Sequence, residues 1–175
     1  CFPEAEVKVL PSISAFVGAD IVAGLASIAP SDKYKNFLFM DIGTNGELAL
    51  VTEKSIWCCS TAAGPAFEGA RISCGMGAVE GAISAYGDEG YVVIGNEKPA
   101  GLCGSGLIDI VAWLVENKIL DSDGLLDNDF TIVPASESGT GQVISLNQTD
   151  VREVQLAKSA IASGVNILLK QSGLT

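Results

Sequence analysis

The segment from Asp41 to Glu47, DIGTNGE, combines residue types that can handle phosphate. An apolar stretch ends at the Asp41 carboxylate, and a tight turn follows at once, made of Gly43, Thr44, Asn45 and Gly46. Backbone N–H groups and a hydroxyl in such a turn can hold an anion, and glycine lets a phosphate approach closely. Asp41 would then be placed to hold a Mg²⁺ water or to orient an attacking water. The alternative is an ordinary Asn-Gly hairpin in which Asp41 bonds its own turn.

A second glycine-rich segment, GLCGSG, directly precedes an apolar helical pattern, and its last residues are Gly104, Ser105 and Gly106. Free N–H groups and the dipole at a helix N-terminus favour anions. The segment lacks the lysine of a P-loop and does not follow the G-x-G-x-x-G pattern. The alternative is that these glycines only let the helix pack closely against a strand.

Two more carboxylates are candidates for chemistry. Glu68 stands among small residues in STAAGPAFEG and could serve as a base or a ligand if it lines a cleft. Asp20 stands inside the apolar stretch Ile13–Ala29, where a buried charge needs a partner. The alternatives are a solvated loop position for Glu68, and helix capping or ion pairing for Asp20.

The composition limits what these residues can do. The 175 residues include 20 glycines and no histidine, and 21 acidic side chains stand against 10 basic ones, for a net charge of −11. This acidity argues against nucleic acid or an anionic membrane as a partner. The absence of histidine removes imidazole as a base, nucleophile activator or metal ligand. An apolar content of 48% is enough for a folded core and excludes disorder.

The five cysteines do not form a recognisable disulfide, zinc or iron–sulfur pattern, because they include one adjacent pair and no C-x-x-C spacing. We therefore expect the cysteines to be small buried residues of a protein in a reducing cytoplasm. The alternative is a redox or metal role for Cys58 and Cys59. The stretch Ile13–Ala29 is interrupted by Asp20 and is too short for a membrane span. Both ends of the sequence lead us to expect a fragment of a longer polypeptide.

The elements that must position these residues follow from hydrophobic periodicity and turn residues. We expect an α/β domain with a short strand over 8–11, a buried helix over 12–29 that breaks over 30–33, and an antiparallel meander of strands over 36–40, 47–52 and 55–61. A broken glycine-rich stretch over 62–81, a strand over 90–95, a helix over 107–118 and a strand pair over 130–134 and 142–146 follow. A last helix is expected to begin at Asp150, with Glu153 as its capping-box partner.

Five segments together resemble one protein family: VLPSISAFVGADIVAGL, FMDIGTNGELAL, CSTAAGPAFEGARI, GLCGSGLIDI and VQLAKSAIASGVNILL. They resemble the ATP-dependent reductive activators of corrinoid proteins, which fall within the superfamily of actin, sugar kinases and heat-shock ATPases. The resemblance covers nearly the whole chain, and the combination of motifs in this order is far more specific than any one of them.

The resemblance implies a ribonuclease H-like (actin-like ATPase) lobe, with a three-stranded antiparallel meander and flanking helices. Residues 1–32 would be a leading strand and buried helix from the preceding region. Residues 33–175 would be the second lobe, with an insertion at about 62–100 and an end before the adenosine-binding glycine motif.

The same resemblance implies ATP and Mg²⁺ as cofactors. Asp41 would be catalytic and bind the metal, and Glu68 would be the other catalytic residue. Gly43, Thr44, Asn45 and Gly46 match the second of the superfamily's two phosphate-binding hairpins and would contact phosphate. Gly104, Ser105 and Gly106 are expected to contact phosphate as well, because they lead into a helix N-terminus. An iron–sulfur cluster is expected only outside this chain, because the chain has no cysteine cluster.

The parent protein would use ATP to reduce a Co(II) corrinoid protein of a methyltransferase system to Co(I), in the cytoplasm, and could be a homodimer. This chain alone would be inactive, since it would carry one wall of the nucleotide cleft. Two other functions stay open. One is a small-molecule kinase of the same superfamily with Glu68 or Asp20 as the base, and the other is a non-catalytic module that docks a partner through an acidic surface.

Overall fold

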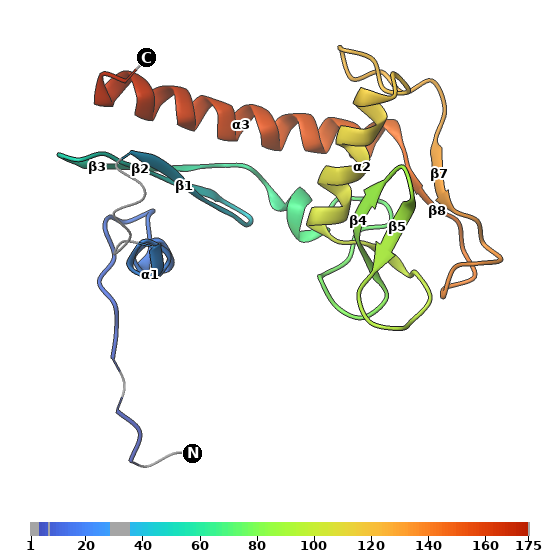
Figure 1. Ribbon diagram of the computed structural model, residues 1–175, viewed down its shortest axis with the longest axis horizontal. Coiled ribbons are helices and arrows are strands. Elements are labelled where there is room, and N and C mark those ends of the chain that lie inside the picture. The colour runs from blue at the N-terminus through green and yellow to red at the C-terminus, as the bar shows by residue number, and fades with distance from the viewer. Residues whose placement is uncertain (1–3, 7, 29–35, 175) are drawn as a thin grey trace. The chain divides into compact units, whose positions relative to one another are not determined.

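The computed structural model describes residues 4–6, 8–28 and 36–174, which fall into two compact units (Figure 1). The first unit takes in Cys1–Asp41, Gly46–Thr61 and Ala162–Thr175, and the second takes in Ile42–Asn45 and Ala62–Ile161. The expected helix break over residues 30–33 lies outside the described residues.

The elements in chain order are α1 (Ala19–Ile28), β1 (Phe37–Ile42), β2 (Gly46–Val51), β3 (Ile56–Thr61), the 3-10 helix η1 (Pro65–Glu68), β4 (Ala82–Gly87), β5 (Gly90–Val93), β6 (Gly101–Leu102), α2 (Gly104–Glu116), β7 (Phe130–Val133), β8 (Ile144–Leu146) and α3 (Gln148–Ser172).

A three-stranded sheet with the order β1-β2-β3 lies at the centre of the first unit. β2 and β3 are antiparallel and pair without a bulge, from Gly46 opposite Thr61 to Val51 opposite Ile56. Thr52 closes the turn between them, because its hydroxyl donates to the Ser55 carbonyl and accepts the Ser55 N–H. The expected meander of three antiparallel strands is confirmed.

Elements cover both faces of this sheet, which explains why β2 is hydrophobic at successive positions. Ala49 and Cys58 are opposite one another in register, and both pack with α1 residues. Leu48 and Cys59 are the next pair, and they lie against Gly164 of α3, where an added Cβ would come 2.6 Å from Leu48 Cδ1. Since successive strand residues point to opposite faces, α1 and the C-terminal part of α3 cover opposite faces.

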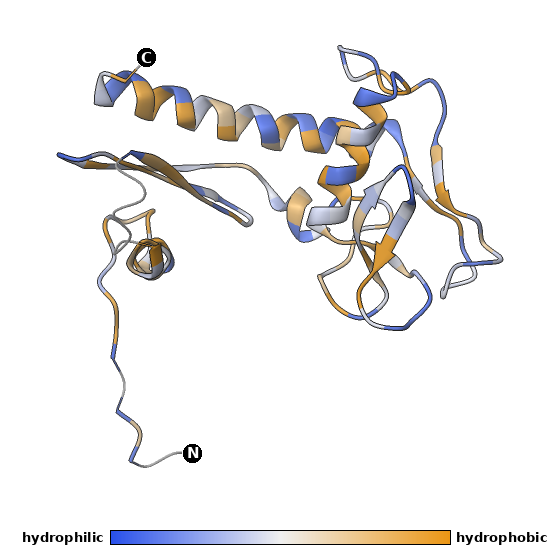
Figure 2. Cartoon of the chain, in the orientation of Figure 1, coloured by the Kyte–Doolittle hydropathy of each residue, from blue (hydrophilic) through white to orange (hydrophobic). Residues whose placement is uncertain are grey.

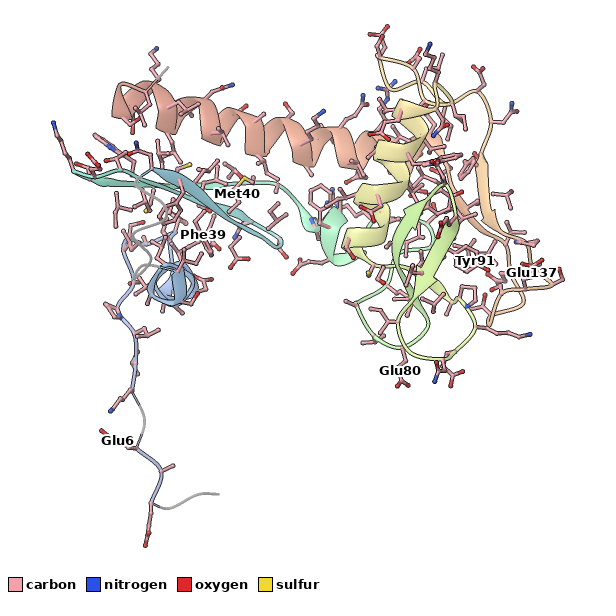
Figure 3. All side chains as sticks on the ribbon, viewed as in Figure 1. Glu6, Phe39, Met40, Glu80, Tyr91 and Glu137 are labelled. Atoms are coloured by element: carbon pink, nitrogen blue, oxygen red, sulfur yellow. The ribbon has the colours of Figure 1, made fainter. Side chains whose placement is uncertain are left out.

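The first helix is shorter and less buried than its sequence pattern predicts. α1 runs over Ala19–Ile28, and within it only Ile21 is buried, so the expected buried helix over 12–29 is wrong in length and in burial. One side of α1 meets the sheet: Gly24 lies so close to the Phe39 ring, labelled in Figure 3, that a Cβ would overlap it. The expected strand over 8–11 is also wrong, because Val9 is 87% exposed and the segment pairs with no strand.

The second unit contains a sheet with the order β5-β4-β6, in which β4 is antiparallel to β5 and parallel to β6. α2 packs along β4, and β7 and β8 form a separate antiparallel pair. The strand over 90–95 and the pair over 130–146 are confirmed in β5, β7 and β8. β4 and β6 were not predicted: four of the six residues of β4 (AISAYG) are Ala, Ser or Gly, which do not favour strands, and β6 has only two residues.

α3 is long but amphipathic, and Figure 2 shows hydrophobic and hydrophilic residues alternating along it. In the described part of the chain, no helix combines the length and apolar character needed to cross a membrane.

The cap at the start of α3 differs from the expected one. Asn147 Oδ1 accepts the N–H of Asp150 at 3.0 Å, and Asp150 Oδ2 accepts the N–H of Asn147 at 3.1 Å. Asn147 is therefore the N-cap residue and Asp150 the third helical residue. The expected box of Asp150 with Glu153 is wrong, and Glu153 lies 3.9 Å from the Arg71 guanidinium instead. The other Asp150 oxygen accepts the Ser73 N–H at 2.8 Å and the Ser73 hydroxyl at 3.1 Å.

Asp150 is fully buried, so its removal should destabilise the second unit strongly. We expect Asp150→Ala to lower the free energy of unfolding by about 3 kcal/mol, because it leaves the Ser73 and Asn147 N–H groups without their charged acceptor. Urea unfolding followed by tryptophan fluorescence measures this loss, with the exposed Asp127→Ala as the control. Equal stability of the two variants would contradict the structural role of Asp150.

Candidate functional site

The turn between β1 and β2 is fastened to the glycine-rich segment that follows β3. The Thr44 hydroxyl donates a hydrogen bond to Glu68 Oε2 at the end of η1. The Gly64 N–H donates to the Thr44 carbonyl at 2.9 Å, and an added Cβ on Gly43 would lie 3.6 Å from Glu68 Oε1. The structure thus brings Glu68 to the turn, although the two are far apart in sequence.

The backbone of this turn differs from the conformation that the Asn-Gly pair predicts. Neither Asn45 nor Gly46 has a positive φ, so the hairpin does not use the left-handed turn that an Asn-Gly pair favours. Gly46 is already the first residue of β2, and its carbonyl accepts the Thr61 hydroxyl at 3.0 Å. The Gly43 N–H donates to the Asn45 carbonyl at 3.1 Å inside the turn.

In the first unit, Asp41 lies in a cluster of three carboxylates with Asp20 of α1 and Glu47 of β2. One oxygen from each lies within 4.8 Å of the other two. Burial, and then the negative charges of Asp20 and Asp41, raise the pKa of Glu47. Hard divalent cations such as Mg²⁺ bind oxygen ligands, so this donor set fits the predicted metal role of Asp41.

From the sequence, the role of Asp20 stayed open and Glu47 was not predicted as a ligand. A signal was present in the alternation of the strands. Glu47 has the same parity in β2 as Ala49, and Asp41 has the same parity in β1 as Phe39. Ala49 and Phe39 both pack with α1 residues, so the parity rule places Glu47 and Asp41 on the α1 face as well.

Gly104, Ser105 and Gly106 form the first turn of α2 rather than a loop before it. An added Cβ on Gly104 would overlap the Phe67 carbonyl, and one on Gly106 would overlap the Ile83 carbonyl. The Ser105 hydroxyl donates to the Ser84 carbonyl at 2.7 Å. Close packing therefore accounts for both glycines, and their predicted contact with phosphate stays a prediction.

The adjacent cysteines of β3 cannot act as one pair of ligands on the sheet, because Cys58 faces α1 and Cys59 faces α3. Burial and then the neighbouring Cys59 raise the pKa of Cys58, and burial raises the pKa of Cys59. A raised thiol pKa disfavours the thiolate that metal binding and redox chemistry require. The structure thus favours the expected packing role for these two cysteines, but both are half-buried rather than buried as expected.

The packing role of Gly104 can be separated from a ligand-binding role. We expect Gly104→Ala to lower the free energy of unfolding by about 2 kcal/mol without any ligand, because the methyl group would meet the Phe67 backbone. Gly77→Ala is the matched control, since Gly77 is exposed and an added Cβ there meets nothing within 4 Å. If Gly104→Ala were as stable as the wild type and lost only phosphate affinity, the packing explanation would be refuted.

Comparison with known proteins gives consistent matches along the chain. The family described as the C-terminal domain of RACo, the ASKHA domain, matches residues 35–175. The chain is 39% identical to the corrinoid activation enzyme RamQ of Eubacterium limosum over 98% of its length. It is 29% identical, over 97% of its length, to a Methanosarcina barkeri reductase named for the Co(II) methylated amine-specific corrinoid protein.

A solved structure of a reductive activator for corrinoid, iron–sulfur protein matches 97% of the chain, with a TM-score of 0.85 and 37% sequence identity. The chain spans about a third of these proteins: 33% and 35% of the two relatives and 30% of the solved chain. The family match covers most of the chain, and the solved structure shares its fold, so the resemblance and the α/β fold class expected from the sequence are confirmed. The chain therefore belongs to the family of C-terminal ASKHA domains of RACo.

Proposed function

We propose that this chain is the nucleotide-handling part of an ATP-dependent activator that reduces a Co(II) corrinoid protein to Co(I). The observation that carries the proposal is the similarity of nearly the whole chain to two proteins named for corrinoid activation or reduction, together with a solved reductive activator. The turn that contains Gly43, Thr44 and Asn45, which the resemblance assigns to phosphate, supports the ATP part of the proposal.

The proposed roles of the residues follow from their chemistry. Backbone N–H groups from Thr44 to Gly46 and the first turn of α2 would contact phosphate, and Gly43, whose N–H donates to the Asn45 carbonyl, would let the phosphate approach closely. Asp41 would hold the metal ion, with Asp20 and Glu47 completing an oxygen donor set. Bound Mg²⁺ would offset the negative charge of these three carboxylates.

The electron would come from outside this chain. Each Co(II) centre takes up one electron to become Co(I), and we propose that a reduced iron–sulfur cluster elsewhere in the parent protein gives up that electron. A low-potential one-electron donor would then reduce the cluster again. The chain alone is therefore expected not to carry out the reduction.

ATP donates no electron, so we propose that it assists the reduction by shifting the equilibrium between two conformations of the activator. A ligand shifts an equilibrium by as much as its affinities for the two conformations differ. We propose that nucleotide favours the conformation in which the activator binds the inactive corrinoid protein, and that loss of the nucleotide releases the product. The partner would be a corrinoid protein of a methyltransferase system.

The Asp41 carboxylate gives the sharpest test of the proposed function. In the full-length protein, we expect Asp41→Asn to slow ATP-dependent Co(I) formation by roughly 100-fold, because a neutral amide holds a divalent cation or polarises a water much less well. The absorbance of the corrinoid partner reports Co(I), and release of ADP is followed in parallel.

Asp129→Asn is a suitable control, since Asp129 is exposed and its substitution makes the same change in charge. Unchanged Co(I) formation by Asp41→Asn would contradict the role of Asp41. Release of ADP that depends on a sugar or an organic acid, and not on corrinoid protein, would favour a small-molecule kinase instead.

A further inference from the structure

Thr44 and Glu68 form a hydrogen-bonded pair in the second unit, in which the threonine hydroxyl is the donor. A hydroxyl has one proton to donate and otherwise only lone pairs. While the Thr44 proton points to Glu68, the outward side of Oγ1 can only accept hydrogen bonds or bind a cation. A phosphate oxygen, which also offers only lone pairs, cannot form a hydrogen bond with that side.

The charge of Glu68 acts in the same direction. Its Oε1 lies 3.6 Å from the position of an added Cβ on Gly43, so the carboxylate lies against the turn that is proposed to receive phosphate. A carboxylate next to an anion site repels a bare phosphate, and a divalent cation on that phosphate reduces the repulsion. Both the hydroxyl and the carboxylate thus favour phosphate that carries a cation.

Close backbone packing holds Glu68 in place. The residue before it, Phe67, has its carbonyl against Gly104, where no Cβ fits. The residue after it, Gly69, has a φ of 84° and lies so near Met76 that a Cβ would come 2.6 Å from that backbone. These contacts fix the backbone at Glu68, and the hydrogen bond from Thr44 directs its exposed side chain toward the turn.

We infer that Glu68 is a specificity-determining residue that makes the turn select cation-bound nucleotide over metal-free nucleotide. It orients the Thr44 hydroxyl so that Oγ1 accepts, and its charge opposes a phosphate that lacks a cation. This inference rests on the proposed function, since it assumes that the turn binds nucleotide.

The test compares the dissociation constant of ATP in Mg²⁺ with that in EDTA, measured by calorimetry on the full-length protein. Glu68→Gln removes the charge and keeps a carbonyl oxygen that can accept the Thr44 proton. We expect this variant to bind metal-free ATP about fivefold more tightly, with unchanged affinity for Mg·ATP. Thr44→Val should weaken the binding of Mg·ATP and leave the binding of metal-free ATP unchanged, because it removes the hydroxyl oxygen that can bind the cation or accept a hydrogen bond.

Glu137→Gln is the matched control, since it makes the same charge change at an exposed position between β7 and β8 in the same unit (Figure 3). If Glu68→Gln weakened both forms of ATP equally, or left their ratio as in the wild type, Glu68 would have only a structural role and the inference would be wrong. If the wild-type protein bound no ATP in either condition, the proposed function would be wrong and the inference with it.

Discussion

Direct packing of backbone against backbone is the constraint on which the second unit depends. At Gly69, Gly75, Gly104 and Gly106, another part of the main chain occupies the space that a side chain would need. Main-chain segments can approach this closely only where the residue has no Cβ. These contacts join η1, the segment after it, α2 and β4, so one constraint fixes both the short sheet and the backbone position of Glu68.

The first unit depends on a different kind of order, the alternation of side chains in β2 and β3. One parity packs with α1 and the other with α3, so the adjacent residues Cys58 and Cys59 have separate environments. The same alternation places Asp41 and Glu47 on the sheet face that α1 covers, where they lie near Asp20 of α1. The mutual repulsion of these carboxylates adds to the raised pKa of Glu47, and a cation would remove that repulsion.

The sequence was sufficient for the features that depend on local patterns. The meander, the strand pair β7–β8, the long last helix and the family follow from periodicity, turn residues and motif order. The features that were missed depend on contacts between distant residues. β4 has only two strand-favouring residues and is held by its neighbouring strands. The buried Asp150 carboxylate accepts hydrogen bonds from the distant Ser73, and nothing local indicates that Glu68 reaches Thr44. The role of Gly104 was left open because packing and anion binding both favour glycine there.

The central claim is that the turn from Asp41 to Glu47 contacts the phosphates of ATP. Hydrogen exchange of the full-length protein, read by mass spectrometry on a peptide over residues 41–47, tests it most directly. Our account predicts that Mg·ATP slows exchange in this peptide, because N–H groups that bind phosphate are protected. If Mg·ATP bound to the protein and slowed exchange only elsewhere, the assignment of this turn to phosphate would be contradicted.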